Sequence, residues 1–124
     1  MSSRGALGLR FNYHLVRTLR AACKGMQALP PKERVGAIEQ LKTIQATMCD
    51  RPRDDRNADG TYLLPASVCL EGGEMVAGFA RDVAEALQAD GDHGVMRVEL
   101  EEFERELAAV LADMKARHPA RRNT

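Results

Sequence analysis

Oxygen-bearing side chains alternate along one polar segment in the middle of the chain. The segment DRNADGTY begins at Asp55. Asp55, Asn57 and Asp59 place side-chain oxygens at the first, third and fifth positions of a loop that winds around a hard cation. Gly60 then allows a sharp turn, and Thr61 offers a backbone carbonyl as the next ligand. The sequence therefore predicts a metal site formed by Asp55, Asn57, Asp59 and Thr61, with calcium as the fitting ion.

This pattern resembles the calcium-binding loop of the EF-hand superfamily, to which calmodulin-like proteins belong. The resemblance covers roughly residues 36–114. The family loop ends with a bidentate glutamate at its twelfth position, where this chain has Ala66. The resemblance thus implies at most one weak calcium site, with a dissociation constant toward about 10⁻⁴ to 10⁻³ M. An ordinary turn is the alternative interpretation, because Asp, Asn and Gly favour turns for local backbone reasons.

A second segment, RVELEEF, looks like the end of another such loop. Its Glu102 lies 36 residues after Ala66, and Val98 lies 36 residues after Tyr62. This separation is typical of two paired EF-hands, in which Tyr62 and Val98 would meet as a very short two-stranded sheet. A twelve-residue count from Gly91, however, does not put oxygen ligands at the required positions. Either this loop is longer and folds differently, or it binds no metal, and we favour the second.

Apolar residues recur at helical spacing over most of the chain. The pattern predicts helices over residues 11–26, 32–48, 76–87 and 103–114, and a short one over 65–70 that Gly72-Gly73 interrupts. We therefore expect an all-α fold, with an EF-hand-like pair of helix-loop-helix units and an additional N-terminal amphipathic helix. The expected organisation is as follows: an N-terminal helix or arm (1–31), the pair (32–117, with hands at about 32–72 and 74–117) and a basic tail (118–124).

Basic residues dominate the start of the chain. The formal net charge is zero, yet the first 32 residues carry six basic side chains and no acid, so the remainder carries 12 bases against 18 acids. A basic amphipathic helix can fold back onto the acidic body, contact an anionic membrane surface or bind another protein. It also resembles a mitochondrial targeting segment. Nucleic-acid binding is not expected, because stacking aromatics do not alternate with these charges.

The composition narrows the class of protein further. Three cysteines, Cys23, Cys49 and Cys69, are widely spaced and odd in number, which favours a reducing compartment over a disulfide framework or a zinc site. No apolar run is long enough for a transmembrane helix. No nucleophile motif, phosphate loop or paired acid and base is present, so an enzyme is not expected. We expect a cytoplasmic protein, with a mitochondrial location as the alternative.

The function most consistent with these features is a calmodulin-like or light-chain-like regulatory adaptor. Such a protein binds another protein through an amphipathic helix, here with weak calcium binding or none. The alternative is a structural helical subunit or assembly factor of a larger complex, which would hold no metal. Residues 15–20 (LVRTLR) are faintly similar to the opening of LYR-motif mitochondrial proteins, although Val16 stands where their tyrosine would be.

Overall fold

A computed structural model describes the backbone of residues 3–49 and 66–117. Four helices make up these ranges: α1 (Ser3–Gln27), α2 (Pro31–Cys49), α3 (Ala66–Ala89) and α4 (Gly94–Arg117). Within the described ranges there is no strand, which confirms the all-α class. None of the helices in these ranges combines the length and the apolar character needed to cross a bilayer. The predicted metal ligands Asp55, Asn57, Asp59 and Thr61 lie outside the described residues, so that site stays a prediction.

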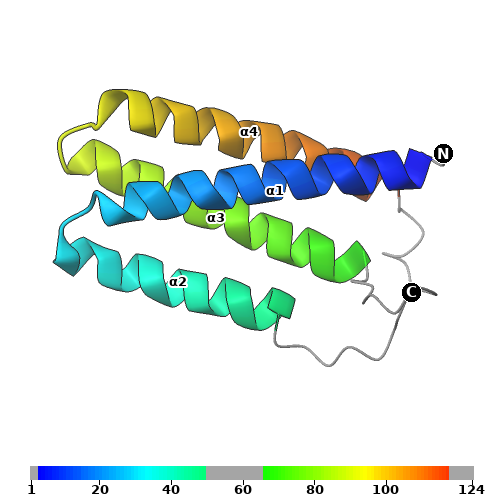
Figure 1. Cartoon of the computed structure of the whole chain (residues 1–124), viewed down its shortest axis with the longest axis horizontal. Helices are drawn as coiled ribbons and strands as arrows, with labels where there is room; N and C mark the ends of the chain where they lie inside the picture. Colours follow the sequence, from blue (N-terminus) through cyan, green and yellow to red (C-terminus); the bar gives the residue numbers. More distant parts are fainter. Residues whose placement is uncertain (1–2, 50–65, 118–124) are drawn as a thin grey trace.

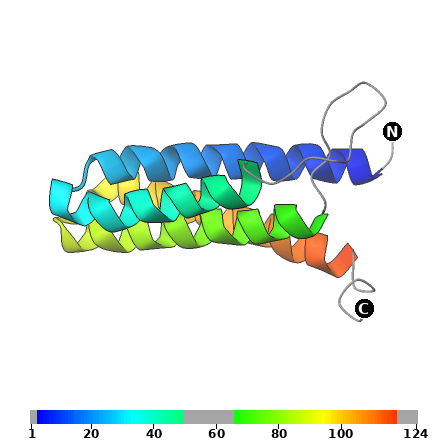
Figure 2. The same cartoon turned by 90° about the horizontal axis from the view of Figure 1, so that it is seen from below.

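Consecutive helices run in opposite directions and form an up-down-up-down bundle (Figures 1 and 2). The most extensive contacts are those of α3 with α4 and of α1 with α4, and α1 also lies along α3. α2 contacts α3 but hardly touches α1. Three helices therefore build the centre of the bundle, and α2 lies beside it. The basic N-terminal helix is part of that centre, since its residues Phe11, Leu15, Ala22 and Met26 belong to the common core.

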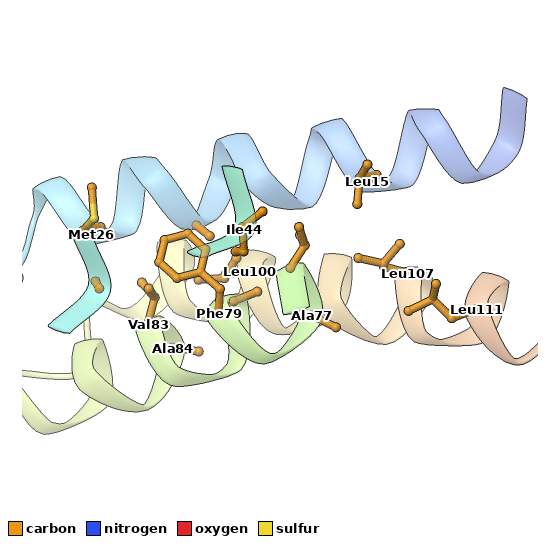
Figure 3. Close-up of a cluster of buried hydrophobic side chains, with 14 of the residues drawn as sticks. Leu15, Met26, Ile44, Ala77, Phe79, Val83, Ala84, Leu100, Leu107 and Leu111 are labelled. Atoms are coloured by element: carbon orange, nitrogen blue, oxygen red, sulfur yellow. The ribbon is translucent and has the colours of Figure 1, made fainter. Parts of the chain in front are cut away.

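The core follows the apolar stripes of the helices, and Figure 3 shows side chains from all four of them meeting between the ribbons. In α3, Val76, Phe79, Val83 and Leu87 are buried, as their spacing predicts. Burying a side chain of this size stabilises the fold by about 1.5–3 kcal/mol. Thr18 is the buried polar residue of the described chain, and its hydroxyl donates to the carbonyl of Phe103 at 3.2 Å. This bond joins the middle of α1 to α4.

Gly72 and Gly73 do not interrupt α3, so the predicted break between two helices is wrong. Glycine lowers helix propensity by only about 1 kcal/mol, and close approach of other side chains explains both positions. A Cβ atom on Gly73 would lie 2.5 Å from Leu111 Cδ2, and one on Gly72 would lie 2.6 Å from Met48 Cγ. The two glycines therefore let α4 and α2 approach α3. One helix occupies the place where separate helices of two hands were predicted.

The second predicted loop is also absent as a loop. α4 begins at Gly94, so Val98 lies in a helix rather than in a strand and is 48% exposed. Asp92 and His93 have positive φ angles of 75° and 50° and reverse the chain within a short turn. Arg97 holds this turn, with its Nε 2.7 Å from the Asp92 carboxylate and its Nη1 2.9 Å from Glu101. The hydrogen bond to Asp92 raises the pKa of Arg97.

α2 buries only part of the stripe that its apolar spacing defines. Val35 and Ile38 of this stripe are 61% and 40% exposed, whereas Ile44 is buried and Leu41 packs against the core. Ala37 and Ile44 are the buried residues of α2 over residues 31–48. The reason is that α2 contacts one main neighbour, α3, so a narrow stripe is enough to hold it.

Candidate protein-interaction surface

A groove of about 590 Å³ follows the outer seam between α1 and α4. Its position results from the stripe of α1 that lies beside the core stripe, at spacings of three and four residues. α4 supplies the opposite wall. We call it the α1–α4 groove, and it is lined by Leu9, Asn12, Tyr13, Val16, Arg17, Arg20, Ala21, Lys24, Glu99 and Phe103.

Arg17 and Phe103 form the floor of this groove. The guanidinium carbon of Arg17 lies 4.0 Å from the centre of the Phe103 ring and 5.0 Å from that of Tyr13. The same guanidinium donates to Glu106, with Nη2 and Oε2 2.5 Å apart. Its Nε is buried and has no hydrogen-bond partner among the described residues. These contacts hold a planar cation against an aromatic face and leave the apolar edge of Tyr13 exposed.

Large apolar side chains stand along both walls. On α1, Leu9 and Tyr13 are 67% and 58% exposed, and Val16 continues the same stripe. On α4, Val95 and Val98 are exposed next to Glu99 and Glu102, around a shallower adjoining hollow. We call the groove together with Val95, Val98 and Glu102 the α1–α4 face. Exposed apolar side chains bordered by charges are typical of interaction surfaces.

Some charged side chains near this face form ion pairs, and others do not. Arg17 pairs with Glu106, and toward the start of α1 Arg10 pairs with Asp113 at 3.2 Å. Arg20 and Lys24 are exposed on α1 and form no ion pair with any residue of the described chain. Glu99 and Glu102 on α4 are likewise exposed and unpaired within it. The face thus carries a basic row, Arg20 and Lys24, on α1 and an acidic row, Glu99 and Glu102, on α4.

Other parts of the described chain offer less for binding or chemistry. Two smaller cavities, of about 270 and 200 Å³, follow the seam between α2 and α3. Over residues 9–48 and 68–117, no three His, Cys, Asp or Glu side chains gather closely enough to hold a metal ion. Cys23 and Cys69 are partly buried, and this burial raises the pKa of both thiols, which disfavours the reactive thiolate. His93 is engaged with Asp90 at 2.8 Å within the turn before α4.

The chain matches no protein-family model, no curated protein and no solved structure. The α1–α4 groove therefore has to be interpreted from its own residues.

The sequence contained a signal for this surface that the periodicity argument did not use. Phe103 begins the apolar stripe that predicts a helix over 103–114, yet it is only partly buried and forms the groove floor. Leu9, Tyr13 and Val16 form a second apolar stripe among the bases of α1. A second stripe at spacings of four and three residues, outside the core stripe, indicates a helix with two apolar faces.

Proposed function

We propose that this protein is a helical adaptor that binds an amphipathic helix of a partner protein in the α1–α4 groove. The observation that carries the proposal is the open apolar channel between Tyr13 and Val16 on one side and Phe103 on the other. Antiparallel helices leave a groove that a third helix fills with side chains at i, i+3 or i+4 and i+7. The volume of about 590 Å³ accommodates several such side chains.

The charges around the groove support a partner with polar flanks on both sides of its apolar stripe. Arg20 and Lys24 favour acidic residues along one flank, and Glu99 favours a basic residue along the other. Charges at the rim of an interface set orientation and association rate more than affinity. The partner helix would therefore enter in one direction.

The proposed mode of action is light-chain-like: a prefolded protein holds a helix without requiring a calcium switch. A calcium site at Asp55, Asn57, Asp59 and Thr61 would lie in the segment that connects α2 to α3, away in sequence from both walls of the groove. The adaptor proposal does not rest on that site. The degenerate EF-hand relationship remains a separate proposal, which rests on the Asp55–Tyr62 segment alone.

A structural subunit of a larger complex is the second candidate function. It is favoured by the further pair of exposed apolar residues on α2, Val35 and Ile38. A subunit buried on two sides would have partners on both α2 and the α1–α4 face. An adaptor needs only the latter.

A pair of matched substitutions tests the adaptor proposal. Val16→Lys introduces a charge into the groove, whereas Val35→Lys introduces the same charge on α2. The affinity of each variant is measured by calorimetry against the purified helix of any protein that the wild-type chain retains at one-to-one stoichiometry. We expect Val16→Lys to weaken binding roughly 30-fold or more and Val35→Lys to leave it within about twofold. Equal losses would favour the subunit, and a loss confined to Val35→Lys would contradict the groove.

A further inference from the structure

The α1–α4 face carries two unpaired charge rows, Arg20 with Lys24 on α1 and Glu99 with Glu102 on α4. The two rows lie at the same position along the length of the bundle. The antiparallel register is set by Arg17 against Glu106 and by Thr18 against the Phe103 carbonyl. About two turns further along α1, a Cβ on Gly25 would contact Leu100. Arg20 and Lys24 fall between these two levels on α1. On α4, Glu102 falls between them and Glu99 lies one residue beyond Leu100.

A two-fold axis can run parallel to the helices, in front of this face. Rotation about this axis leaves every residue at the same position along the length of the bundle. It places α1 of one copy opposite α4 of a second copy, in the same antiparallel sense as within one chain. Arg20 then faces Glu102 of the second copy, and Lys24 faces its Glu99. The reciprocal pairs form on the other side of the axis, as an isologous interface requires. A two-fold axis perpendicular to the helices would instead put α1 of one copy against α1 of the other. The basic residues Arg20 and Lys24 of the two copies would then face each other.

We propose that the chain forms a symmetric dimer through the α1–α4 face, with α1 of each copy against α4 of the other. Opposite charges at equal height make this face self-complementary, which is the property that an interface between identical copies needs. The apolar residues of the groove beside these charges, among them Val16 and Phe103, become shielded from water. The floor contacts of Arg17 remain within each chain.

This inference uses the surface of the proposed function but does not depend on a partner protein. A dimer formed in this way closes the groove of both copies. An amphipathic helix then binds only after the copies separate, so chain concentration regulates access. Because the ion pairs lie at a solvent-exposed rim, the dimer is expected to weaken as salt screens them.

Charge exchange on the purified full-length chain tests the dimer. Sedimentation velocity is recorded from micromolar to millimolar chain for the wild type, for Arg20→Glu/Lys24→Glu and for Glu99→Lys/Glu102→Lys. The wild type should dimerise reversibly. Each variant alone places like charges opposite each other at all four contacts, and its dimer dissociation constant should rise roughly tenfold or more. An equimolar mixture of the two variants places opposite charges at every contact and should restore the dimer.

Two controls separate specific pairing from net charge. Lys32→Glu/Lys42→Glu and Glu39→Lys/Glu85→Lys make the same changes in charge on α2 and α3, and they should leave self-association unchanged. Circular dichroism of every variant verifies folding. A wild-type chain that stays monomeric at millimolar concentration would overturn the dimer, even if a partner helix still binds. Retained dimers in both face variants, or a mixture that fails to associate, would also overturn it, whereas failure of the partner helix to bind affects only the adaptor function.

Discussion

The guanidinium of Arg17 on α1 lies over the ring of Phe103 on α4, 4.0 Å from the ring centre. Residues 86 positions apart in the chain thereby join the two walls of the groove. The side chain of Arg17 is 26% exposed, and its charge is balanced by Glu106. The contact links stability to function, because the residue that holds the two helices together also forms the floor of the interaction surface.

Replacing Arg17 should destabilise the bundle measurably. Arg17→Ala removes the stacking on Phe103 and the bond to Glu106, and we expect a loss of about 1–2 kcal/mol in the free energy of unfolding. Arg17→Lys keeps the charge but lacks the planar group, so it should recover only part of this loss. Urea denaturation with a constant slope measures both. Lys42→Ala, which removes an exposed pair with Glu39, is the control and should cost less than about 0.5 kcal/mol.

The glycines of α3 give a second, opposed pair of predictions. Gly73→Ala places a methyl group 2.5 Å from Leu111 Cδ2 and 3.1 Å from Phe11 Cε1, so we expect overpacking to cost about 1–3 kcal/mol. Gly78→Ala meets nothing within 4 Å and should stabilise the helix by up to about 1 kcal/mol. Thermal unfolding of the two variants would show opposite shifts. Similar shifts would mean that helix propensity alone governs both positions.

Thiol reactivity should report the burial of Cys23 and Cys69. Burial raises the pKa of each above its ordinary value of 9.0, and only the thiolate reacts. In a Cys49→Ser background, alkylation near neutral pH should be roughly 3- to 10-fold slower than for a short cysteine peptide. Urea should abolish the difference, and reaction at the peptide's rate without urea would contradict the burial.

The same shifts make stability depend on pH in a defined direction. Because the folded pKa lies above the unfolded value, the unfolded chain releases its thiol proton first as the pH rises past 9.0. This contribution to the free energy of unfolding is complete below 9.0 and is lost as the pH rises through the folded pKa. Urea denaturation across this range, compared with Cys23→Ser/Cys69→Ser, isolates it.

A calcium titration tests whether the one metal site that the sequence predicts binds calcium. Calorimetry of the wild type is compared with Asp55→Ala/Asp59→Ala and with magnesium. A real loop should give a saturable, calcium-selective signal with a dissociation constant of about 10⁻⁴ to 10⁻³ M, which the double variant loses. No heat in the wild type up to millimolar calcium would remove calcium from the account and leave the groove unaffected.

Helix content and most core positions followed from apolar periodicity, because a helix that buries one face must repeat at three and four residues. The apolar spacing of Phe11, Leu15 and Ala22 agrees with their burial in α1, because α1 packs against both α3 and α4. The same pattern placed Val35 and Ile38 of α2 wrongly. Periodicity does not tell how many neighbours a helix has, and α2 has one main neighbour.

The errors around Gly72-Gly73 and Val98 have a different origin. Glycine pairs suggest a break when only local preference is considered, whereas the Leu111 side chain that occupies the space beside Gly73 comes from 38 residues further along the chain. A shared spacing of 36 residues likewise carries no information on whether Val98 is helical. The groove could not be predicted from the sequence for the same reason, because it forms only where α1 and α4 lie side by side.

The most direct test of the central claim is photo-cross-linking from the α1–α4 face in cells that make the protein. A photoreactive phenylalanine analogue replaces Val16 in one variant and, as a matched exposed position on α2, Ile38 in another. The account predicts that Val16 yields cross-links that map to one apolar helical stripe, either of a single partner or of α4 in a second copy, while Ile38 yields none. Cross-links of equal yield from both positions, or from Ile38 alone, would contradict it.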